Sequence, residues 1–144
     1  MVEIVQLKTA KKGNLTDIIH LLSELRRNPA EHTGTLSDLR DIVGNKKAVM
    51  MVARDGTHIV GMATLYVVVK VGKHVGFVED VVVDSRYRGQ GIGKNLMHAL
   101  VALARKKKLV YLFLTSHDKR GAANKLYQTL GFELVDTNPY RLKF

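Results

Sequence analysis

The chain contains no cysteine and only two prolines among its 144 residues. Without cysteine it can form no disulfide framework and offers no thiol nucleophile. Few prolines and no long polar tract argue against disorder. No stretch approaches the roughly 18 uninterrupted apolar residues that a membrane helix needs, and the first residues lack a basic segment followed by an apolar one. We therefore expect a cytoplasmic protein that does not cross a membrane.

Aromatic side chains and negative charge are also scarce. Four Phe and five Tyr are the aromatic residues, and 23 Lys and Arg against 13 Asp and Glu give a formal net charge of +10. A basic surface attracts anions, but a single-strand nucleic-acid site would place aromatic stacking platforms beside the charge. The lysine clusters at 11–12, 46–47 and 106–108 are not interleaved with aromatics. Nucleic acid, an acidic protein and a phosphorylated small molecule are all compatible with this charge. We favour solvated basic faces together with a phosphate-bearing ligand, such as an acidic or phosphorylated small molecule, over nucleic acid.

The length and the 46% apolar share predict one domain, residues 1–144, with a single core. Alternating and helical apolar spacings predict its elements. Strands are expected at 3–7, 48–54, 57–69, 74–83 and 110–115, helices at 14–27, 36–43, 91–108 and 122–130, and a last hairpin at 132–135 and 140–144. Asn28-Pro29 should end the first helix, and Asp55-Gly56 and Gly72-Lys73 should form turns. The order predicts a mixed α/β sheet, with 110–115 buried on both faces.

A glycine-rich segment between a strand and a helix carries the clearest functional signal. Residues 88–94 read Arg-Gly-Gln-Gly-Ile-Gly-Lys. The start of a helix exposes backbone N–H groups and a partial positive charge that suit a phosphate, and glycines let the backbone approach an oxyanion closely. Arg88 and Lys94 add full positive charges nearby. The segment therefore predicts a phosphate-binding loop.

Other phosphate loops fit this segment less well. The dinucleotide fingerprint requires G-x-G-x-x-G in a parallel β-α-β unit, whereas the spacing here is G-x-G-x-G after antiparallel strands. A Walker A loop needs Ser or Thr after its lysine, and Asn95 follows Lys94. The remaining alternative is a turn without a ligand, for which three alternating glycines are more than is needed.

Two segments resemble the GNAT acetyltransferase family. Residues 88–93 match its [QR]-x-x-G-x-[GA] pattern, and residues 123–132, ANKLYQTLGF, resemble its A-x-x-[LF]-Y-x-x-[LF]-G-F segment in the expected order. The likeness covers residues 48–144 well and the first helices only by their order. Within the family, the short chain and the strand 79–83 resemble the glucosamine-6-phosphate N-acetyltransferases. The resemblance implies a mostly antiparallel sheet, splayed near Val83, with helices on both faces.

The resemblance also implies acetyl-CoA as co-substrate and places its binding groups. Main-chain groups of Val81, Val82 and Val83 would pair with the pantetheine arm, and one of their N–H groups would polarise the thioester carbonyl. The backbone from Arg88 to Lys94 would hold the pyrophosphate. In this arrangement the side chains of Gln90 and Ile92 should matter little, and Gly89, Gly91 and Gly93 allow the close approach, with Gly91 and Gly93 resisting substitution.

The second matching segment supplies two further candidates. Tyr127 occupies the position of the family's general acid, and a phenol with a pKa near 10 is matched to an alkyl thiol. The alternative is a core tyrosine beside Leu126 and Leu130. Asn124, one turn earlier on the same helix face, matches a position that often bonds the coenzyme. Its alternative is an exposed polar side chain.

For the general base, Glu79 is the first candidate and Asp80 the second. A carboxylate beside the thioester would take a proton from the substrate ammonium, through water. The two side chains point to opposite faces of a regular strand, although a bulge would change which of them faces the substrate. Either acid could instead serve only in an ion pair with a basic residue, and some family members need no protein base.

Metal binding has little support, because the six histidines show no H-x-x-x-H spacing. His117 follows a predicted strand, where it could line the acceptor pocket, although a surface loop is the better-supported interpretation. Ser116 and Arg120 leave the same two alternatives open. The expected function is transfer of an acetyl group to a primary amine of a small molecule. A protein or peptide acetyltransferase, a non-catalytic acyl-CoA-binding module and, third, a nucleic-acid-binding protein remain open as alternative functions. The family resemblance is also compatible with a homodimer. The sequence of region 32–44 does not show whether the acceptor site is open, as a peptide would need, or closed.

Overall fold

The computed structural model describes residues 1–25 and 34–144 of the chain. The predicted end of the first helix at Asn28-Pro29, and His32 at the start of the undecided region, lie outside the described residues. The chain forms two compact units, Met1–Leu114 and Thr115–Phe144. No helix of the described ranges is both long enough and apolar enough to cross a bilayer.

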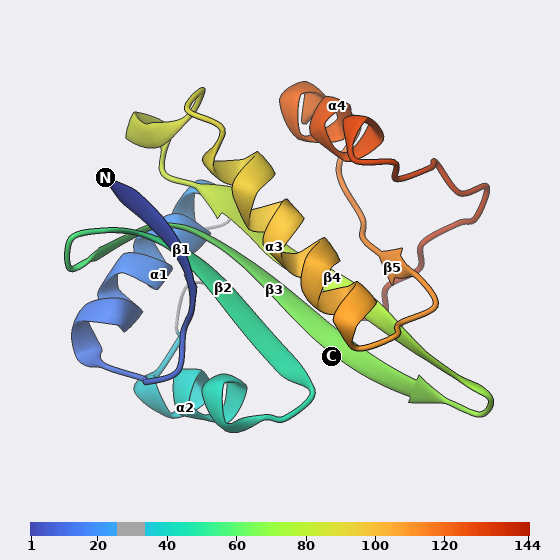
Figure 1. Cartoon of the computed structure of the whole chain (residues 1–144), viewed down its shortest axis with the longest axis horizontal. Coiled ribbons are helices and arrows are strands. Elements are labelled where there is room, and N and C mark those ends of the chain that lie inside the picture. Colours follow the sequence, from blue (N-terminus) through green and yellow to red (C-terminus); the bar gives the residue numbers. More distant parts are fainter. Residues whose placement is uncertain (26–33) are drawn as a thin grey trace. The chain divides into compact units, whose positions relative to one another are not determined.

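The first unit is built on a five-stranded sheet with the order β1-β2-β3-β4-β5 (Figure 1). The first four strands are antiparallel, and β5 is parallel to β4. Its elements are β1 (Val2–Gln6), α1 (Lys12–Leu25), α2 (Leu36–Gly44), β2 (Ala48–Asp55), β3 (His58–Lys70), β4 (Lys73–Val83), the 3₁₀ helix η2 (Ser85–Tyr87), α3 (Ile92–Lys106) and β5 (Leu112–Phe113). The prediction of a mixed, mostly antiparallel sheet is confirmed.

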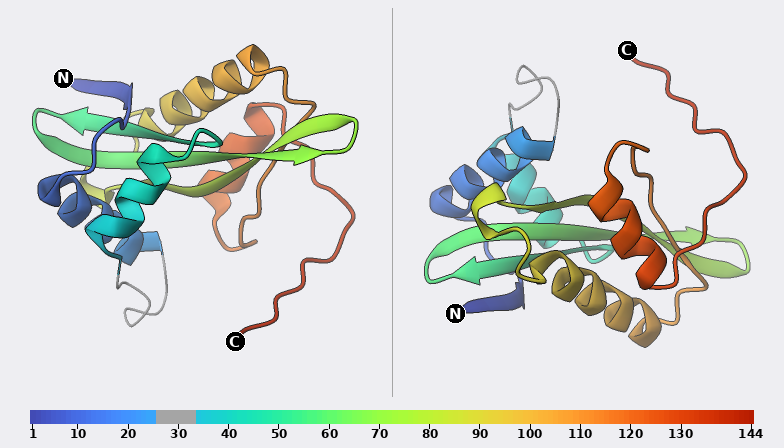
Figure 2. Two further views of the ribbon diagram at one scale, coloured as in Figure 1. Left: turned by 90° about the horizontal axis from the view of Figure 1, so that it is seen from below. Right: turned by 90° about the horizontal axis from the view of Figure 1, so that it is seen from above.

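Helices cover both faces of this sheet, as expected. Helices α1 and α2 lie on one face and α3 lies on the other (Figure 2). The core on the first side includes Leu21 of α1, Leu39 of α2 and Met62 of β3. On the other side, α3 packs closely against β3 at Gly61. A Cβ at this position would lie 3.3 Å from a methyl group of Leu96 in α3, so the position needs a small residue. Apolar spacing of 3.6 in the helices and of 2 in the strands directs these side chains inward.

The two hairpins turn one residue away from the predicted positions. Asp55 pairs with His58, so the first loop is Gly56-Thr57, and Lys70 pairs with Lys73, so the second is Val71-Gly72. Gly56 and Gly72 have φ of 59° and 85°. Each glycine was therefore recognised correctly as the residue that takes the left-handed conformation, but its place within the turn was not.

The predicted strand at 110–115 is shorter and more exposed than expected. β5 contains only Leu112 and Phe113, both half-buried, and the side chains of Val110 and Tyr111 are 62% and 39% exposed. Because β5 lies at the end of the strand order and pairs only with Gly76 and Phe77 of β4, this run is not a strand buried on both faces. The continuous apolar sequence of residues 110–115 had predicted a strand in the centre of the sheet.

The second unit contains α4 (Gly121–Thr129), close to the predicted helix at 122–130. The hairpin expected at 132–135 and 140–144 is wrong, because no strand forms after α4. The alternating apolar residues of this segment lie exposed: Leu134, Val135, Tyr140, Leu142 and Phe144. A strand needs both a hydrogen-bonding neighbour and a face to bury, and an apolar pattern alone supplies neither.

Candidate active site

Strand β4 continues well beyond its pairing with β5. The last register pair between the two strands joins Phe77 to Phe113, whose rings lie 5.6 Å apart between centroids. β4 then runs on to Val83 while pairing with β3 on its other side. The sheet therefore opens after Phe77, as expected for a sheet splayed near Val83, and an extended ligand arm could lie along this part of β4.

A β-bulge interrupts β4 at the predicted catalytic carboxylates. Met62 pairs with Val82 and Thr64 pairs with Glu79, so Ala63 lies opposite two residues, Asp80 and Val81. Asp80 has a φ of 53°, in the left-handed region that Asp and Asn enter more readily than most residues. Regular alternation between Glu79 and Asp80 is broken, so the two carboxylates are not confined to opposite faces.

The surroundings of Glu79 favour its neutral form. Burial, followed by the negative charge of Asp80, raises the pKa of Glu79 above its ordinary value of 4.5. Tyr66 of β3 belongs to the same cluster, because burial and the charges of Asp80 and Glu79 raise the pKa of its phenol. The sequence had not identified Tyr66. Tyr66 lies two residues after Thr64 on β3, and Thr64 is the register partner of Glu79. This proximity follows only from the pairing of the strands.

The glycine-rich loop has the backbone conformation expected of a cradle. Gly89 and Gly91 both have φ of 77°, and a Cβ on either would meet no atom within 4 Å. Gly91 caps the N-terminus of α3 without any side-chain hydrogen bond, so this helix start is open to an external acceptor. These residues fit a pyrophosphate group.

One detail of the loop differs from the expectation. The side chain of Ile92 is only 4% exposed, so it belongs to the core and its identity matters for packing. Ile92 is the first residue of α3, and its burial fixes the helix start against the sheet. By contrast Gln90 is exposed, as the prediction of an unimportant side chain requires.

The side chain of Arg88 is held by groups of the protein. Its Nε donates to the carbonyl of Val83 at 3.0 Å, and its Nη2 donates to Oε2 of Glu24 at 2.8 Å. Glu24 also accepts the backbone N–H of Ser85 at 2.9 Å and its hydroxyl at 3.1 Å. One carboxylate on α1 thus contacts both ends of the short segment between β4 and the glycine loop.

Two further carboxylates secure the same segment. Asp84 is 2% exposed and accepts three hydrogen bonds from Arg86, one from the backbone N–H and two from the guanidinium. The Arg86 guanidinium holds the pKa of Asp84 well below its usual range. The Tyr87 hydroxyl donates to Asp55 of β2 at 2.8 Å. None of these contacts was expected from the sequence.

His20, Glu24 and Asp84 could geometrically surround a cation, since their ligand atoms lie within 4.8 Å of one another. The two carboxylates already accept hydrogen bonds from Arg86, Arg88 and Ser85. A metal ion would have to displace the guanidinium groups of Arg86 and Arg88 and the hydroxyl of Ser85, so this cluster is better described as an ion-pair network.

The predicted residues of the second unit show both polar contacts and burial. Tyr127 is 6% exposed. Burial raises the pKa of its phenol, and the positive charge of Arg120, followed by a hydrogen bond with Arg120, opposes the rise. The amide of Asn124 donates to the carbonyls of His117 and Asp118, which gives it a structural contact in its own unit. His117 is exposed and pairs with Asp118, in agreement with a surface loop.

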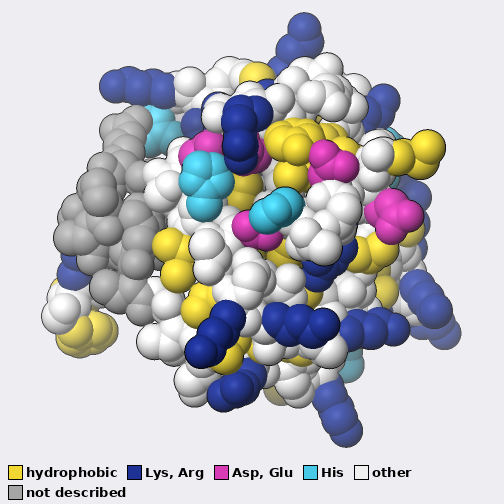
Figure 3. Space-filling model, turned by 90° about the vertical axis from the view of Figure 1, so that its left-hand side faces the viewer, with side chains coloured by type: hydrophobic (Ala, Val, Ile, Leu, Met, Phe, Trp, Pro, Cys, Tyr) yellow, Lys and Arg dark blue, Asp and Glu magenta, His cyan; other side chains and the backbone are white. Residues whose placement is uncertain are grey.

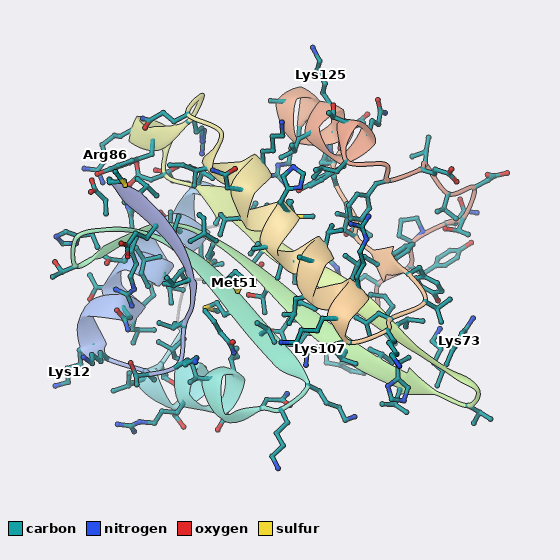
Figure 4. All side chains as sticks on the ribbon, in the orientation of Figure 1. Lys12, Met51, Lys73, Arg86, Lys107 and Lys125 are labelled. Carbon is teal, nitrogen blue, oxygen red and sulfur yellow. The ribbon has the colours of Figure 1, made fainter. Side chains whose placement is uncertain are left out.

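Charges of both signs are distributed over the molecule. On the face in Figure 3, acidic and histidine side chains gather above a row of Lys and Arg side chains. Figure 4 shows Arg86 on the short helix η2, Lys107 at the C-terminal end of α3 and Lys73 at the tip of the β3–β4 hairpin. This distribution resembles solvated basic positions more than one continuous nucleic-acid surface.

Comparison with known proteins agrees with this geometry. A sequence model of the acetyltransferase (GNAT) family matches residues 15–132. The chain is 33% identical over 140 residues to a glucosamine 6-phosphate N-acetyltransferase of Trypanosoma brucei brucei, covering 92% of each chain. It is 28% identical over 132 residues to a thialysine N-epsilon-acetyltransferase of Caenorhabditis elegans, covering 90% of this chain and 82% of the relative.

Solved structures extend the similarity to the fold. The crystal structure of a Trypanosoma brucei acetyltransferase superimposes with a TM-score of 0.81 at 30% identity, and each chain is covered completely. The family match includes the glycine loop, the bulged strand and Tyr127. The chain therefore belongs to the acetyltransferase (GNAT) family, whose members use acetyl-CoA as co-substrate.

Proposed function

We propose that this protein transfers the acetyl group of acetyl-CoA to a primary amine of a small, anionic molecule. The observation that carries the proposal is the bulge at Asp80, because Glu79 and Asp80 lie just beyond the last pairing of β4 with β5. A carboxylate pair beside an open strand edge, followed by a phosphate cradle, suits amine acetylation by a thioester. We propose further that residues 1–144 act as one catalytic domain, because the family match spans both compact units.

The chain holds the coenzyme through backbone groups in this proposal. Main-chain groups of Val81, Val82 and Val83 align the pantetheine arm, and an N–H group among them polarises the thioester carbonyl. N–H groups from Arg88 to Lys94 bind the pyrophosphate at the start of α3, which Gly89 and Gly91 keep accessible. Asn124 is retained as a further coenzyme contact on the strength of the family motif.

Glu79 and Tyr127 move the protons of the reaction. Bound acetyl-CoA supplies an activated acetyl group. Glu79 removes a proton from the substrate ammonium, directly or through water, so that the nitrogen lone pair can form the new N–C bond. The C–S bond breaks, and Tyr127 gives its phenolic proton to the departing thiolate. The raised pKa of Glu79 makes it a stronger base than an ordinary carboxylate, and the raised pKa of Tyr127 keeps its proton in place at neutral pH. Asp80 takes the role of base if Glu79 does not.

The relatives narrow the acceptor class. One is named for glucosamine 6-phosphate and another for thialysine, and both molecules carry a primary amine and an anionic group. With a net charge of +10, this protein would attract a phosphorylated acceptor from solution, whereas thialysine carries a net positive charge at neutral pH and gains nothing from this attraction. We therefore propose an amino sugar phosphate as the acceptor, and an amino acid with a side-chain amine is the alternative that the second relative suggests.

The decisive measurement is thiol release from acetyl-CoA with a panel of amines. The panel contains glucosamine 6-phosphate, glucosamine, lysine, thialysine, a polyamine, an aminoglycoside and a lysine-containing peptide. We expect turnover with a phosphorylated amine and a lower kcat/KM for the counterpart that lacks the phosphate, such as glucosamine. Preference for the peptide would identify a protein or peptide acetyltransferase instead. Coenzyme binding without turnover on any amine would favour a regulatory acyl-CoA-binding module.

A further inference from the structure

The carboxylate of Glu24 lies at the junction between α1 and the glycine-rich loop. It accepts the backbone N–H and the hydroxyl of Ser85, at 2.9 and 3.1 Å, and the Nη2 of Arg88, at 2.8 Å. These bonds span 61 and 64 residues of sequence. Its side chain is 16% exposed and that of Arg88 is 57% exposed, so the carboxylate is partly shielded from water while the guanidinium remains open to solvent.

Arg88 completes this junction by binding in a second direction. Its Nε donates to the Val83 carbonyl at 3.0 Å, so a single guanidinium links the end of β4 to the carboxylate on α1. The loop that follows Arg88 contains Gly89 and Gly91, which both have φ of 77°. Glycines at such positions give a loop many alternative conformations, and a loop that must be ordered by its ligand binds that ligand more weakly.

We propose that Glu24 is a positioning residue for the coenzyme loop and that Arg88 acts as its tether rather than as a phosphate ligand. This inference rests on the proposed function, in which the loop holds the pyrophosphate of acetyl-CoA. Glu24 touches neither the coenzyme nor the acceptor. It holds the segment 85–88 against α1, so that the backbone N–H groups following Arg88 are oriented before the coenzyme arrives.

A double-mutant cycle with coenzyme A as the probe tests the tether. The variants are Glu24→Gln, Arg88→Met and the combined variant, and the measured quantity is the Kd for coenzyme A from calorimetric titration. If the two side chains act as one unit, each single variant weakens binding about tenfold and the combined variant weakens it no further. Glu24→Gln with unchanged Kd, or single losses that multiply in the combined variant, would show that Arg88 acts on the phosphates by itself and would overturn the inference.

A matched control separates positioning from general loss of stability. Asp17 is another carboxylate of α1, and it accepts the backbone N–H of Ile59 at 2.8 Å rather than a group of segment 85–88. Asp17→Asn should lower the melting temperature while leaving the Kd for coenzyme A within about twofold of the wild type. Glu24→Gln should raise the KM for acetyl-CoA about tenfold while kcat at saturation stays within about twofold. A fall in kcat with an unchanged KM would contradict a positioning role.

The outcomes for the two proposals are distinguishable. Wild-type protein that does not bind coenzyme A at millimolar concentration overturns the proposed function and the tether with it. Wild-type protein that binds tightly, together with Glu24→Gln that binds equally well, overturns the tether alone and leaves the acetyltransferase proposal standing.

Discussion

Asp84 and Arg86 form a bidentate ion pair although they are only two residues apart in the sequence. The guanidinium donates from Nε at 3.0 Å and from Nη2 at 2.6 Å, and the Arg86 backbone N–H adds a third bond at 2.9 Å. Asp84 is almost completely buried while the Arg86 side chain is 74% exposed. The carboxylate thus fixes the turn from β4 into η2, and the arginine closes over it from the solvent side.

Because of this ion pair, we expect the free energy of unfolding to fall at acid pH. Because the pKa of Asp84 in the folded protein lies well below its ordinary value of 3.8, its contribution is fully present above pH 3.8 and is lost as the pH falls below it. Asp84→Asn should lower the free energy of unfolding by about 1–2 kcal/mol at pH 7. Urea unfolding at pH 7, 5, 4 and 3 should show that the difference from the wild type shrinks below pH 4. A difference that is as large at pH 3 as at pH 7 would contradict the assignment.

Glu79 should account for the acid limb of the pH–rate profile. Glu79→Gln removes the proposed base and should lower kcat/KM about 100-fold or more. In the wild type, kcat/KM should rise with pH through a pKa above 4.5, because Glu79 must lose its proton and burial with Asp80 raises its pKa. Steady-state rates with the best amine of the panel, between pH 4.5 and 8, would show this limb and its absence in the variant.

Asp80→Asn is the matched control for Glu79. Asn enters the left-handed region readily, so the bulge at φ 53° should persist, while the negative charge beside Glu79 disappears. The acid limb should then move to lower pH, and the maximal rate should stay within a few-fold of the wild type. If Asp80→Asn abolishes turnover and Glu79→Gln does not, the roles of the two carboxylates are reversed.

The apolar pattern of the sequence predicted a helix or strand correctly where the apolar residues of that pattern are also buried in the fold. Helix α3 was found because Leu96, Met97 and Leu100 recur on one face and are fully buried. The run at 110–115 and the alternation after Gly131 have equally apolar sequences. There the apolar side chains lie at a sheet edge or exposed, and a single sequence does not reveal which apolar residues the fold covers.

The candidate site also has a part that the local sequence reveals and a part that depends on the tertiary fold. The glycine loop is local, and its residues could be recognised from their order in the sequence. The bulge at Asp80 depends on the register with β3, and the carboxylates Glu24 and Asp55 reach the loop from elements far away in the sequence. A one-residue change of strand register exchanges the two faces, so proximity of Tyr66 to Glu79 could not be inferred before the strands were paired.

Gly91→Ala should weaken coenzyme binding through backbone strain alone. A Cβ at this position meets no atom within 4 Å, but the φ of 77° is costly for alanine, by about 1–2 kcal/mol. Relaxation of this strain would rotate the first N–H groups of α3 away from the pyrophosphate, and we expect the Kd for coenzyme A to rise about tenfold. Gly13→Ala in α1 is the control, because it also meets no atom within 4 Å and lacks a positive φ. The idea fails if both variants bind coenzyme A like the wild type.

Tyr127→Phe distinguishes catalysis from mere coenzyme binding. The substitution keeps the aromatic ring, which is 6% exposed and lies 6.0 Å from the ring of Phe132, and removes only the hydroxyl. If the phenol protonates the departing thiolate, kcat should fall about 100-fold or more while the Kd for coenzyme A changes less than about twofold. Burial raises the pKa of Tyr127 above its ordinary value of 10.0, so loss of its proton should not limit the wild-type rate below pH 10.

The same variant also decides between two sources of the proton. If solvent protonates the thiolate, Tyr127→Phe turns over at the wild-type rate, and Tyr127 is then a packing residue whose removal shows only in the melting temperature. A fall in kcat that is smaller for acyl donors with a more acidic thiol leaving group would instead confirm the acid, because such thiolates depart without protonation. Acetyl-CoA and an acetylated aryl thiol, compared in both proteins at saturating amine, provide that contrast.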